Sequence, residues 1–255
     1  MKLNFRALGH GPPLIILHGL LGSLANWSPL ASVFGTQFSV FILDLRNHGG
    51  SPHADRFDYE AMAADLADFM RDQNLTQTNL LGHSLGGKAA MRFAQLHPEA
   101  VRKLVVVDMS PRAYPPQHAE LLEAMLALDL KTFHRRDEID TALAPAVPEK
   151  VMRQFLLKNV GRDATGAFYW KPNLRAIHAN YPLLNAALPA DGQFTGTTLF
   201  IRGGNSNYVT DADFTAACKL FPRAEMETIP GAGHWVHADA PGEFARHGLI
   251  FLTAA

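Results

Sequence analysis

The sequence predicts an α/β fold in which a mostly parallel central sheet is flanked by helices and carries an inserted helical cap. Two observations predict this fold. Short apolar runs alternate with amphipathic helical patterns along most of the chain, and most of these runs are continuously apolar, as in strands buried on both faces. The alternation lapses between residues 111 and 195. We therefore expect residues 1–110 and 196–255 to form the core and residues 111–195 to form the cap.

The composition suits one compact body with few charges. The chain has 255 residues, of which 47% are hydrophobic and 18% charged, with 23 basic and 24 acidic side chains. This low charge content excludes a disordered chain, and the absence of a Lys/Arg cluster argues against a nucleic-acid partner. The single cysteine, Cys218, cannot form an intrachain disulfide, and the first residues lack the apolar stretch of a secretory signal. The apolar run at 14–17 is far shorter than the ~20 residues of a membrane span, so we expect a cytoplasmic protein without a membrane partner.

The strands of the core are expected where the apolar runs recur. They lie at 14–17, 40–43, 79–81, 104–107, 198–201 and 225–229, with a possible edge strand at 3–5. The helical patterns between them lie at 59–71, 85–96, 212–220 and 241–252. In the first of these, apolar residues recur on one face, and Asp65, Asp68 and Asp72 fall on the opposite face, which we expect to be exposed.

The segment from 111 to 195 has a different pattern. It opens with Pro111, Pro115 and Pro116, and helical patterns follow at 119–128, 149–160 and 173–181. Residues 161–170 form a glycine-bounded turn segment between the last two helices. A group of helices inserted between two strands of one sheet is typical of a lid over an active site.

The motif Gly82-His83-Ser84-Leu85-Gly86 follows the strand at 79–81 and precedes the helix at 85–96. A serine at a sharp strand-to-helix turn between two glycines is the nucleophile elbow of serine hydrolases. The glycines are needed because neighbouring chains touch the turn, and the strain lifts the serine hydroxyl above the sheet. This motif predicts Ser84 as the nucleophile, against the alternative of a glycine-rich turn with an incidental serine.

A serine hydroxyl needs a base to take its proton, and that base needs a partner that fixes its tautomer. In this arrangement the histidine comes late in the chain, in a loop past the last strand. His234, in the loop that follows the strand at 225–229, fits that position. The alternatives are a surface histidine, or a metal pair with His237; no third ligand has suitable spacing, so we expect no metal.

The acid has more than one candidate. Asp108 ends the strand at 104–107, where its carboxylate would stand at the carboxyl edge of the sheet. The commoner position follows the next strand, but Ser206 stands there in place of an aspartate. A hydroxyl can orient an imidazole but cannot neutralise an imidazolium, so the sequence favours Asp108, with Ser206 as an auxiliary group. Asp211 is a weaker rival because it is placed to cap the following helix.

Acyl transfer also requires donors for a developing oxyanion. We expect the backbone N–H of Leu85 to be one donor, and that of Leu20, in the glycine loop after the strand at 14–17, to be the second. Trp235, beside the predicted base, is a candidate for shaping an acyl pocket, and His18 and His83 are candidates for lining it, although both could equally be structural. Residues 46–48 could reach the pocket, but a buried turn network with Asp44 is the favoured interpretation.

These motifs together resemble the α/β-hydrolase superfamily, and in particular the sequence is similar to bacterial YbfF-type esterases and their mitochondrial relatives. The matching stretches cover nearly the whole chain and lie at 18–23, 44–49, 82–88, 107–111, 203–206 and 231–238, with looser matches in the cap at 155–159 and 170–174. Gly50 departs from the pattern, which usually has a bulkier residue there. The serine at the later acid position belongs to the pattern, and so the resemblance supports Asp108 as the acid.

The resemblance implies hydrolysis of carboxylic esters and of acyl thioesters, with acyl-CoA as a substrate class, through an acyl-enzyme and without a cofactor. The partner would be a small-molecule acyl ester or thioester. Two alternatives keep the same fold: a C–C bond hydrolase or lyase that uses the same triad, and a non-catalytic receptor for a small ligand.

Overall fold

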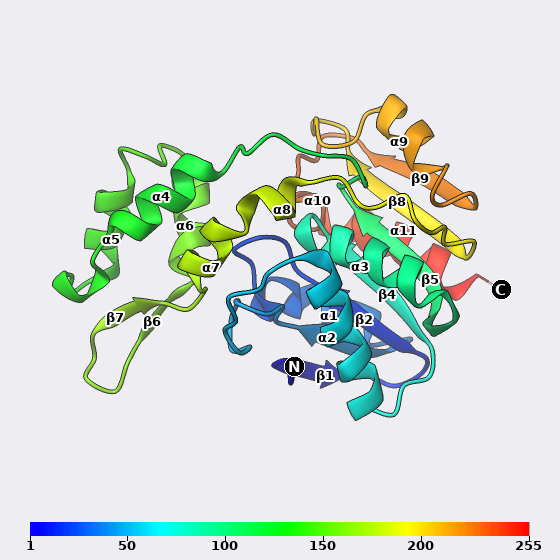
Figure 1. Cartoon of the computed structure of the whole chain (residues 1–255), viewed down its shortest axis with the longest axis horizontal. Helices are drawn as coiled ribbons and strands as arrows, with labels where there is room; N and C mark the ends of the chain where they lie inside the picture. The colour runs from blue at the N-terminus through cyan, green and yellow to red at the C-terminus, as the bar shows by residue number, and fades with distance from the viewer. Residues whose placement is uncertain (255) are drawn as a thin grey trace.

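A seven-stranded sheet forms the centre of the protein, in a computed structural model that describes residues 1–254 (Figure 1). The strand order is β1-β3-β2-β4-β5-β8-β9, and only the edge strand β1 runs antiparallel to its neighbour. The strands are β1 (Phe5–Leu8), β2 (Pro13–Leu17), β3 (Ser39–Leu43), β4 (Thr78–His83), β5 (Val101–Val107), β8 (Thr197–Gly203) and β9 (Ala224–Ile229). The mostly parallel sheet predicted from the apolar runs is confirmed.

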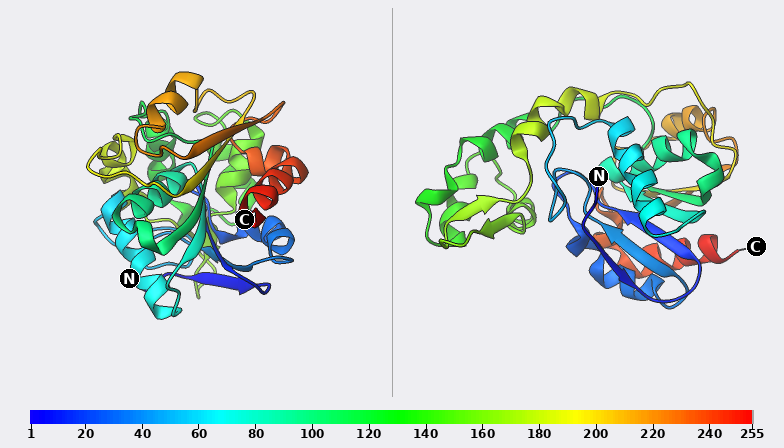
Figure 2. Two further views of the ribbon diagram at one scale, coloured as in Figure 1. Left: turned by 90° about the vertical axis from the view of Figure 1, so that its right-hand side faces the viewer. Right: turned by 60° about the horizontal axis from the view of Figure 1, so that its bottom comes forward.

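Alternate residues of the central strands build two cores, one on each face of the sheet. Leu14 and Ile16 of β2 point to the same core as α1 (Ser28–Phe34) and α11 (Pro241–Thr253). Ile15 and Leu17 point to the other core, which includes α2 (Tyr59–Asp72) and α3 (Leu85–Leu96). The short helix α9 (Asp211–Ala217) lies near β9, and α10 (Val236–Asp239) directly precedes α11 (Figure 2). No helix within residues 1–254 combines the length and apolarity needed to cross a membrane.

Between β5 and β8 the chain forms a separate lobe that projects beyond one end of the sheet (Figure 1). It contains α4 (Ala119–Ala127), α5 (Arg136–Leu143), α6 (Lys150–Leu157), α7 (Leu174–Ala179), α8 (Tyr181–Asn185) and a hairpin of β6 (Val160–Arg162) and β7 (Phe168–Trp170). Three-residue or four-residue 3₁₀ helices lie at Leu24–Trp27, Pro98–Ala100 and Leu130–Thr132. The sequence pattern missed α1, α5, α8 and α10, and it assigned the hairpin residues to the end of a helix and a turn segment.

The two linkers of this lobe lie side by side. The Tyr114 amide donates to the Asn185 carbonyl at 2.8 Å, and the Leu188 amide donates to the Pro111 carbonyl at 2.8 Å. Further contacts tie the lobe to the core: the Tyr59 hydroxyl of α2 donates to the Leu184 carbonyl at 2.6 Å. The lobe therefore leaves and re-enters the core at one place.

Asp65 does not lie on an exposed helix face as the pattern predicts. Its side chain is 2% exposed, and it accepts two hydrogen bonds from the Arg46 guanidinium at 2.6 and 2.8 Å. Residues 46–48 are buried, as the favoured turn network requires, but Arg46 pairs with Asp65 and not with Asp44. The Asp44 carboxylate instead accepts the amides of Leu24 and Gly50 and the Asn4 side chain. Arg46 and Asp65 pair because burial of either charge alone would cost several kcal/mol.

Candidate active site

Ser84 occupies the turn between β4 and α3 with φ 53° and ψ −118°, a strained conformation for a residue with a side chain. The flanking glycines permit this turn. A Cβ atom on Gly82 would lie 2.2 Å from the Gly86 carbonyl oxygen, and one on Gly86 would lie 2.6 Å from the His18 carbonyl oxygen. The elbow therefore has the close packing that its motif predicts.

The structure brings Ser84, His234 and Asp108 into one hydrogen-bonded chain. His234 Nε2 lies 3.1 Å from Ser84 Oγ, and His234 Nδ1 lies 2.7 Å from Asp108 Oδ2. Because a carboxylate only accepts, Nδ1 carries the proton and Nε2 is left to accept the proton of the serine hydroxyl. The imidazole thus has the tautomer that a general base requires.

Asp108 is 1% exposed and lies one residue past β5, with φ 46°. Its Oδ1 accepts the Gly203 amide at 3.1 Å, and its Oδ2 accepts the Ser206 hydroxyl as well as His234. Ser206 therefore contacts the carboxylate rather than the imidazole. Asp211, the other candidate acid, pairs with Arg202 at 2.7 Å at the start of α9 and is not part of this chain.

The loop after β2 presents a free amide beside the elbow. The Gly22 amide donates to the Gly19 carbonyl at 2.9 Å, so Leu20 and Leu21 form the corner of the turn. Among the described residues, neither the Leu20 amide nor the Leu85 amide donates to a protein acceptor, and the two residues lie with Ser84 around one small pocket. Both amides are therefore available to an oxygen bound near Ser84.

His18 and His83 both lie beside Ser84, and protein partners occupy both ring nitrogens of His18 and the Nε2 atom of His83. The Leu45 amide donates to His18 Nε2 at 3.0 Å, so His18 Nδ1 is the donor to the Gly19 carbonyl at 2.8 Å. His83 Nε2 donates to the His234 carbonyl at 2.9 Å. Burial lowers the pKa of both imidazoles, so they stay neutral. Both residues shape the site and hold its loops, and His18 has no ring nitrogen left with which to bind a polar group of a substrate.

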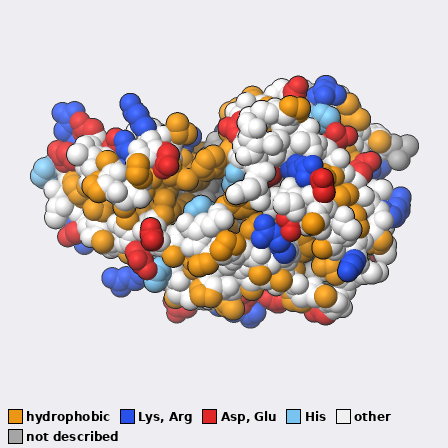
Figure 3. All heavy atoms as spheres, turned by 90° about the horizontal axis from the view of Figure 1, so that it is seen from above, with side chains coloured by type: hydrophobic (Ala, Val, Ile, Leu, Met, Phe, Trp, Pro, Cys, Tyr) orange, Lys and Arg blue, Asp and Glu red, His pale blue; other side chains and the backbone are white. Residues whose placement is uncertain are grey.

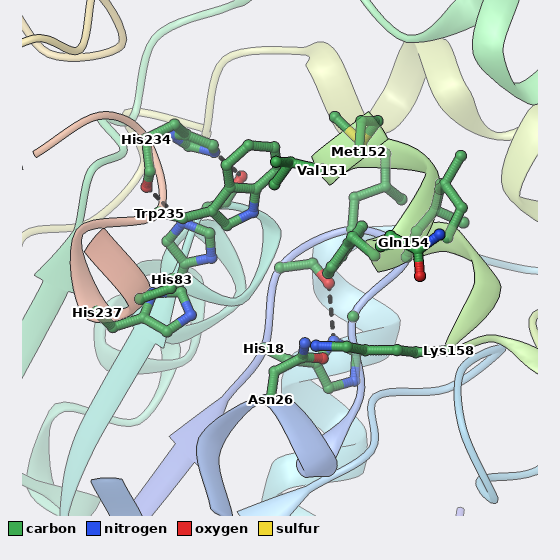
Figure 4. Close-up of a pocket in the computed structure, with 18 of the residues that line it drawn as sticks. His18, Asn26, His83, Val151, Met152, Gln154, Lys158, His234, Trp235 and His237 are labelled. Atoms are coloured by element: carbon green, nitrogen blue, oxygen red, sulfur yellow. Dashed lines mark hydrogen bonds between the residues drawn. The ribbon is translucent and has the colours of Figure 1, made fainter. Parts of the chain in front are cut away.

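A cavity of about 760 Å³ lies between the core and the projecting lobe and opens on Ser84 and His234. Figure 3 shows the hollow with hydrophobic side chains gathered along it. The lobe contributes one side of α6, including Met152 and Phe155, and the core contributes Trp235. Figure 4 shows Met152 and Trp235 at this cavity. The ring centroids of Trp235 and Phe155 lie 5.9 Å apart. Lys150 and Lys158 also line it. The cavity is thus mainly apolar, with two cationic side chains on the side of the lobe.

Two further residues at the site were not singled out from the sequence. The Tyr208 ring stacks on the His234 ring with centroids 3.7 Å apart. Lys88, in the first turns of α3, is 1% exposed, and its ammonium donates to the Ala186 carbonyl at 2.6 Å. Burial lowers the pKa of Lys88 to about 7. The sequence assigned no role to either residue. The available signals were that Tyr208 lies two residues after Ser206 and that Lys88 lies within the matching stretch 82–88, four residues after Ser84.

Comparison with known proteins identifies the family to which the chain belongs. The family model for the alpha/beta hydrolase fold matches residues 12–241. The chain is 39% identical over 250 residues to the sn-1-specific diacylglycerol lipase ABHD11 of Mus musculus, which covers 95% of this chain and 81% of that protein. It is 34% identical over 254 residues to esterase YbfF of Escherichia coli K12, which covers 96% of this chain and 97% of that protein.

Among solved structures, a marine microorganism esterase superposes with a TM-score of 0.96 at 41% sequence identity, covering 98% of this chain and 99% of that one. The likeness extends over the core and the projecting lobe alike, since nearly the whole of both chains is matched. The chain therefore belongs to the α/β hydrolase fold family, and it is a carboxylic ester hydrolase of the YbfF esterase type.

Proposed function

We propose that the protein hydrolyses carboxylic esters and acyl thioesters through an acyl-enzyme on Ser84. The observation that carries this proposal is the unbroken hydrogen-bonded chain from Ser84 Oγ through His234 to Asp108, which opens on an apolar cavity. A serine at this distance from a neutral, correctly protonated imidazole can be deprotonated as it attacks an ester carbonyl.

In the proposed reaction, His234 Nε2 takes the hydroxyl proton while Ser84 Oγ bonds to the carbonyl carbon. The negative oxygen that forms is stabilised by the amides of Leu20 and Leu85. His234 then gives its proton to the departing alcohol or thiol, and the acyl group stays on Ser84. Water, deprotonated by the same imidazole, attacks the acyl-enzyme and releases the acid. Asp108 keeps the imidazole oriented throughout and stabilises its charged form, while Ser206 holds Asp108.

The cavity supports an acyl substrate with a long or bulky apolar part. Residues 111–195 act as the cap in this proposal, and Met152, Phe155 and Trp235 form the apolar wall along which the acyl chain would lie. Lys150 and Lys158 give the same cavity two cations, which suit an anionic leaving group such as the phosphates of coenzyme A. This charge pattern is the structural support for thioesters of the acyl-CoA class.

The test is a rate series over acyl chain length, with matched p-nitrophenyl esters and CoA thioesters. Ser84→Ala should abolish turnover of every substrate, because removing a triad nucleophile costs about 10⁶-fold in kcat. Near-normal turnover by Ser84→Ala would refute the acyl-enzyme. Lys150→Ala and Lys158→Ala should raise KM for CoA thioesters and leave that for p-nitrophenyl esters unchanged; equal effects on both series would remove the support for acyl-CoA.

A further inference from the structure

Tyr208 covers one face of the His234 imidazole. The two rings are stacked at 3.7 Å between centroids with an interplanar angle of 17°. Tyr208 lies in the loop between β8 and α9 and is a wall residue of the cavity. No step of the proposed reaction uses it. A ring so close and so nearly parallel to the base is in a position to influence the charge that the base acquires.

The Tyr208 ring is held in place from several sides. Its backbone amide donates to Ser206 Oγ at 3.2 Å, and its carbonyl accepts the Tyr114 hydroxyl at 2.8 Å. The Tyr114 ring stacks on the Tyr208 ring at 5.6 Å and 29°. The Tyr208 hydroxyl lies 3.3 Å from Gln117 Oε1. Because backbone contacts and stacking fix the ring, removal of the hydroxyl alone should leave the ring where it is.

The other titratable groups around His234 are the Asp108 carboxylate and three imidazoles. The His83 ring centroid lies 4.8 Å from that of His234, and His118 Nε2 lies 3.4 Å from the Tyr208 hydroxyl. Burial, together with the charge of a protonated His234, lowers the pKa of His83, of His118 and of His237. These three imidazoles therefore bring no charge to the site near pH 7. Within the described residues, Asp108 is then the one charged group in contact with the base.

We propose that Tyr208 is a positioning residue that stabilises the imidazolium form of His234 through the negative face of its ring. The proposal rests on the proposed function, in which His234 Nε2 takes the Ser84 proton and becomes cationic. An aromatic face attracts a cation more strongly than a neutral ring, most of all where water is excluded. The interaction thus strengthens as the proton moves from Ser84 Oγ to His234 Nε2, which lowers the barrier without tightening substrate binding.

Two variants separate the ring face from the hydroxyl and from simple burial. Tyr208→Phe keeps the aromatic ring face over His234 and removes only the hydroxyl. Tyr208→Leu keeps an apolar side chain over His234 but has no aromatic ring. We expect Tyr208→Phe to keep kcat/KM within about twofold of wild type on a p-nitrophenyl ester. We expect Tyr208→Leu to lose about tenfold, equivalent to ~1.4 kcal/mol, mainly in kcat. The acidic limb of its kcat/KM profile should also move to lower pH, because the protonated base has lost its stabilising partner.

A series of increasingly fluorinated phenylalanines at position 208 tests the role of the ring face while the shape of the side chain stays nearly constant. Fluorination weakens the negative face, so kcat should fall and the acidic limb should move to lower pH stepwise along the series. Equal rates and an unmoved limb along the series, or a Tyr208→Leu effect confined to KM, would overturn the proposal. If Ser84→Ala is inactive while position 208 has no such effect, only the role of Tyr208 fails; an active Ser84→Ala would refute the acyl-enzyme itself.

Discussion

The Gly203 amide at the end of β8 donates a hydrogen bond to Asp108 Oδ1 across 3.1 Å, although the two residues lie 95 positions apart. Through this bond β8, the strand after the projecting lobe, holds Asp108, which follows β5, the strand before the lobe. A Cβ atom on Gly203 would lie 2.2 Å from the Gly233 carbonyl oxygen, so the loop that carries His234 packs against the same glycine. Asp108, the proposed acid, and the loop that carries His234, the proposed base, thus both pack against Gly203 at the carboxyl edge of the sheet.

The role of Asp108 can be tested by comparing two substitutions. Asp108→Asn removes the charge that stabilises the imidazolium and permits the wrong tautomer of His234, so we expect kcat to fall by about 10⁴-fold. Ser206→Ala removes one hydrogen bond to Asp108 and should cost about tenfold, because that carboxylate keeps its contacts with Gly203 and His234. Steady-state kinetics on one ester measure both. The reverse ranking would show that Asp108 is not the acid.

The elbow glycines should be intolerant of a methyl group. Gly82→Ala would place Cβ 2.2 Å from a backbone oxygen, and we expect it to lower the free energy of unfolding by a few kcal/mol. Gly242→Ala is the matched control: it lies in the first turn of α11, with nothing within 4 Å of the added Cβ. It should be neutral or stabilising by up to ~1 kcal/mol. Urea unfolding of both variants measures the difference, and equal stabilities would contradict the close packing.

Replacing only Asp65 of the buried Arg46–Asp65 pair should lower the stability of the fold more than replacing both residues. Asp65→Asn leaves a guanidinium that is almost fully buried without its counter-charge, and we expect a loss of about 3–5 kcal/mol in the free energy of unfolding. The double variant Arg46→Met with Asp65→Leu removes both charges and should recover part of that loss. Denaturant unfolding measures the three proteins. A double variant less stable than Asp65→Asn would show that the charges themselves stabilise the fold.

Lys88 should make stability depend on pH in alkaline solution. Burial lowers its pKa to about 7 in the folded chain, against 10.5 for the exposed side chain. Between these values the unfolded chain binds more protons, so the contribution of Lys88 to the free energy of unfolding rises with pH from about 7 to 10.5. Below that window, folding carries the full cost of burying the charge.

Lys88→Met should therefore flatten the rise in stability relative to the wild type. Urea unfolding of both proteins at pH 7 and at pH 9.5 measures it, and the difference between the two proteins cancels the other titrating groups. Parallel stability curves would show that Lys88 keeps its charge in the folded state.

The sheet was predictable because buried parallel strands are continuously apolar over a few residues, which is a local signal. The runs at 14–17 and 104–107 became β2 and β5 with shifts of one to three residues at their ends. The proximity of Ser84, Asp108 and His234 was also predictable, because each of them follows a strand at the carboxyl edge of the sheet. Their catalytic roles stay predictions until the variants are measured.

What the sequence could not supply was pairing between distant positions. Asp65 has a helical period that places it among exposed acids, and its burial is explained by two distant partners, the Arg46 guanidinium and the N-terminal ammonium of Met1. Tyr208 stacks on a histidine 26 positions away, and the hairpin of β6 and β7 forms on a segment whose glycines indicated a turn. These features depend on which surfaces meet after folding, and neither periodicity nor a motif encodes that.

The paired linkers of the projecting lobe have a consequence for how such an enzyme can diversify. The segment that leaves the core and the segment that returns to it are hydrogen-bonded to each other, Leu188 to Pro111 and Tyr114 to Asn185. The two ends of the lobe therefore lie next to each other. We expect that its length can change without moving any strand of the sheet, because the entropic cost of closing a loop between fixed ends grows only slowly with its length. In the proposed function, a change in the lobe would therefore alter the wall of the cavity while Ser84, His234 and Asp108 keep their positions.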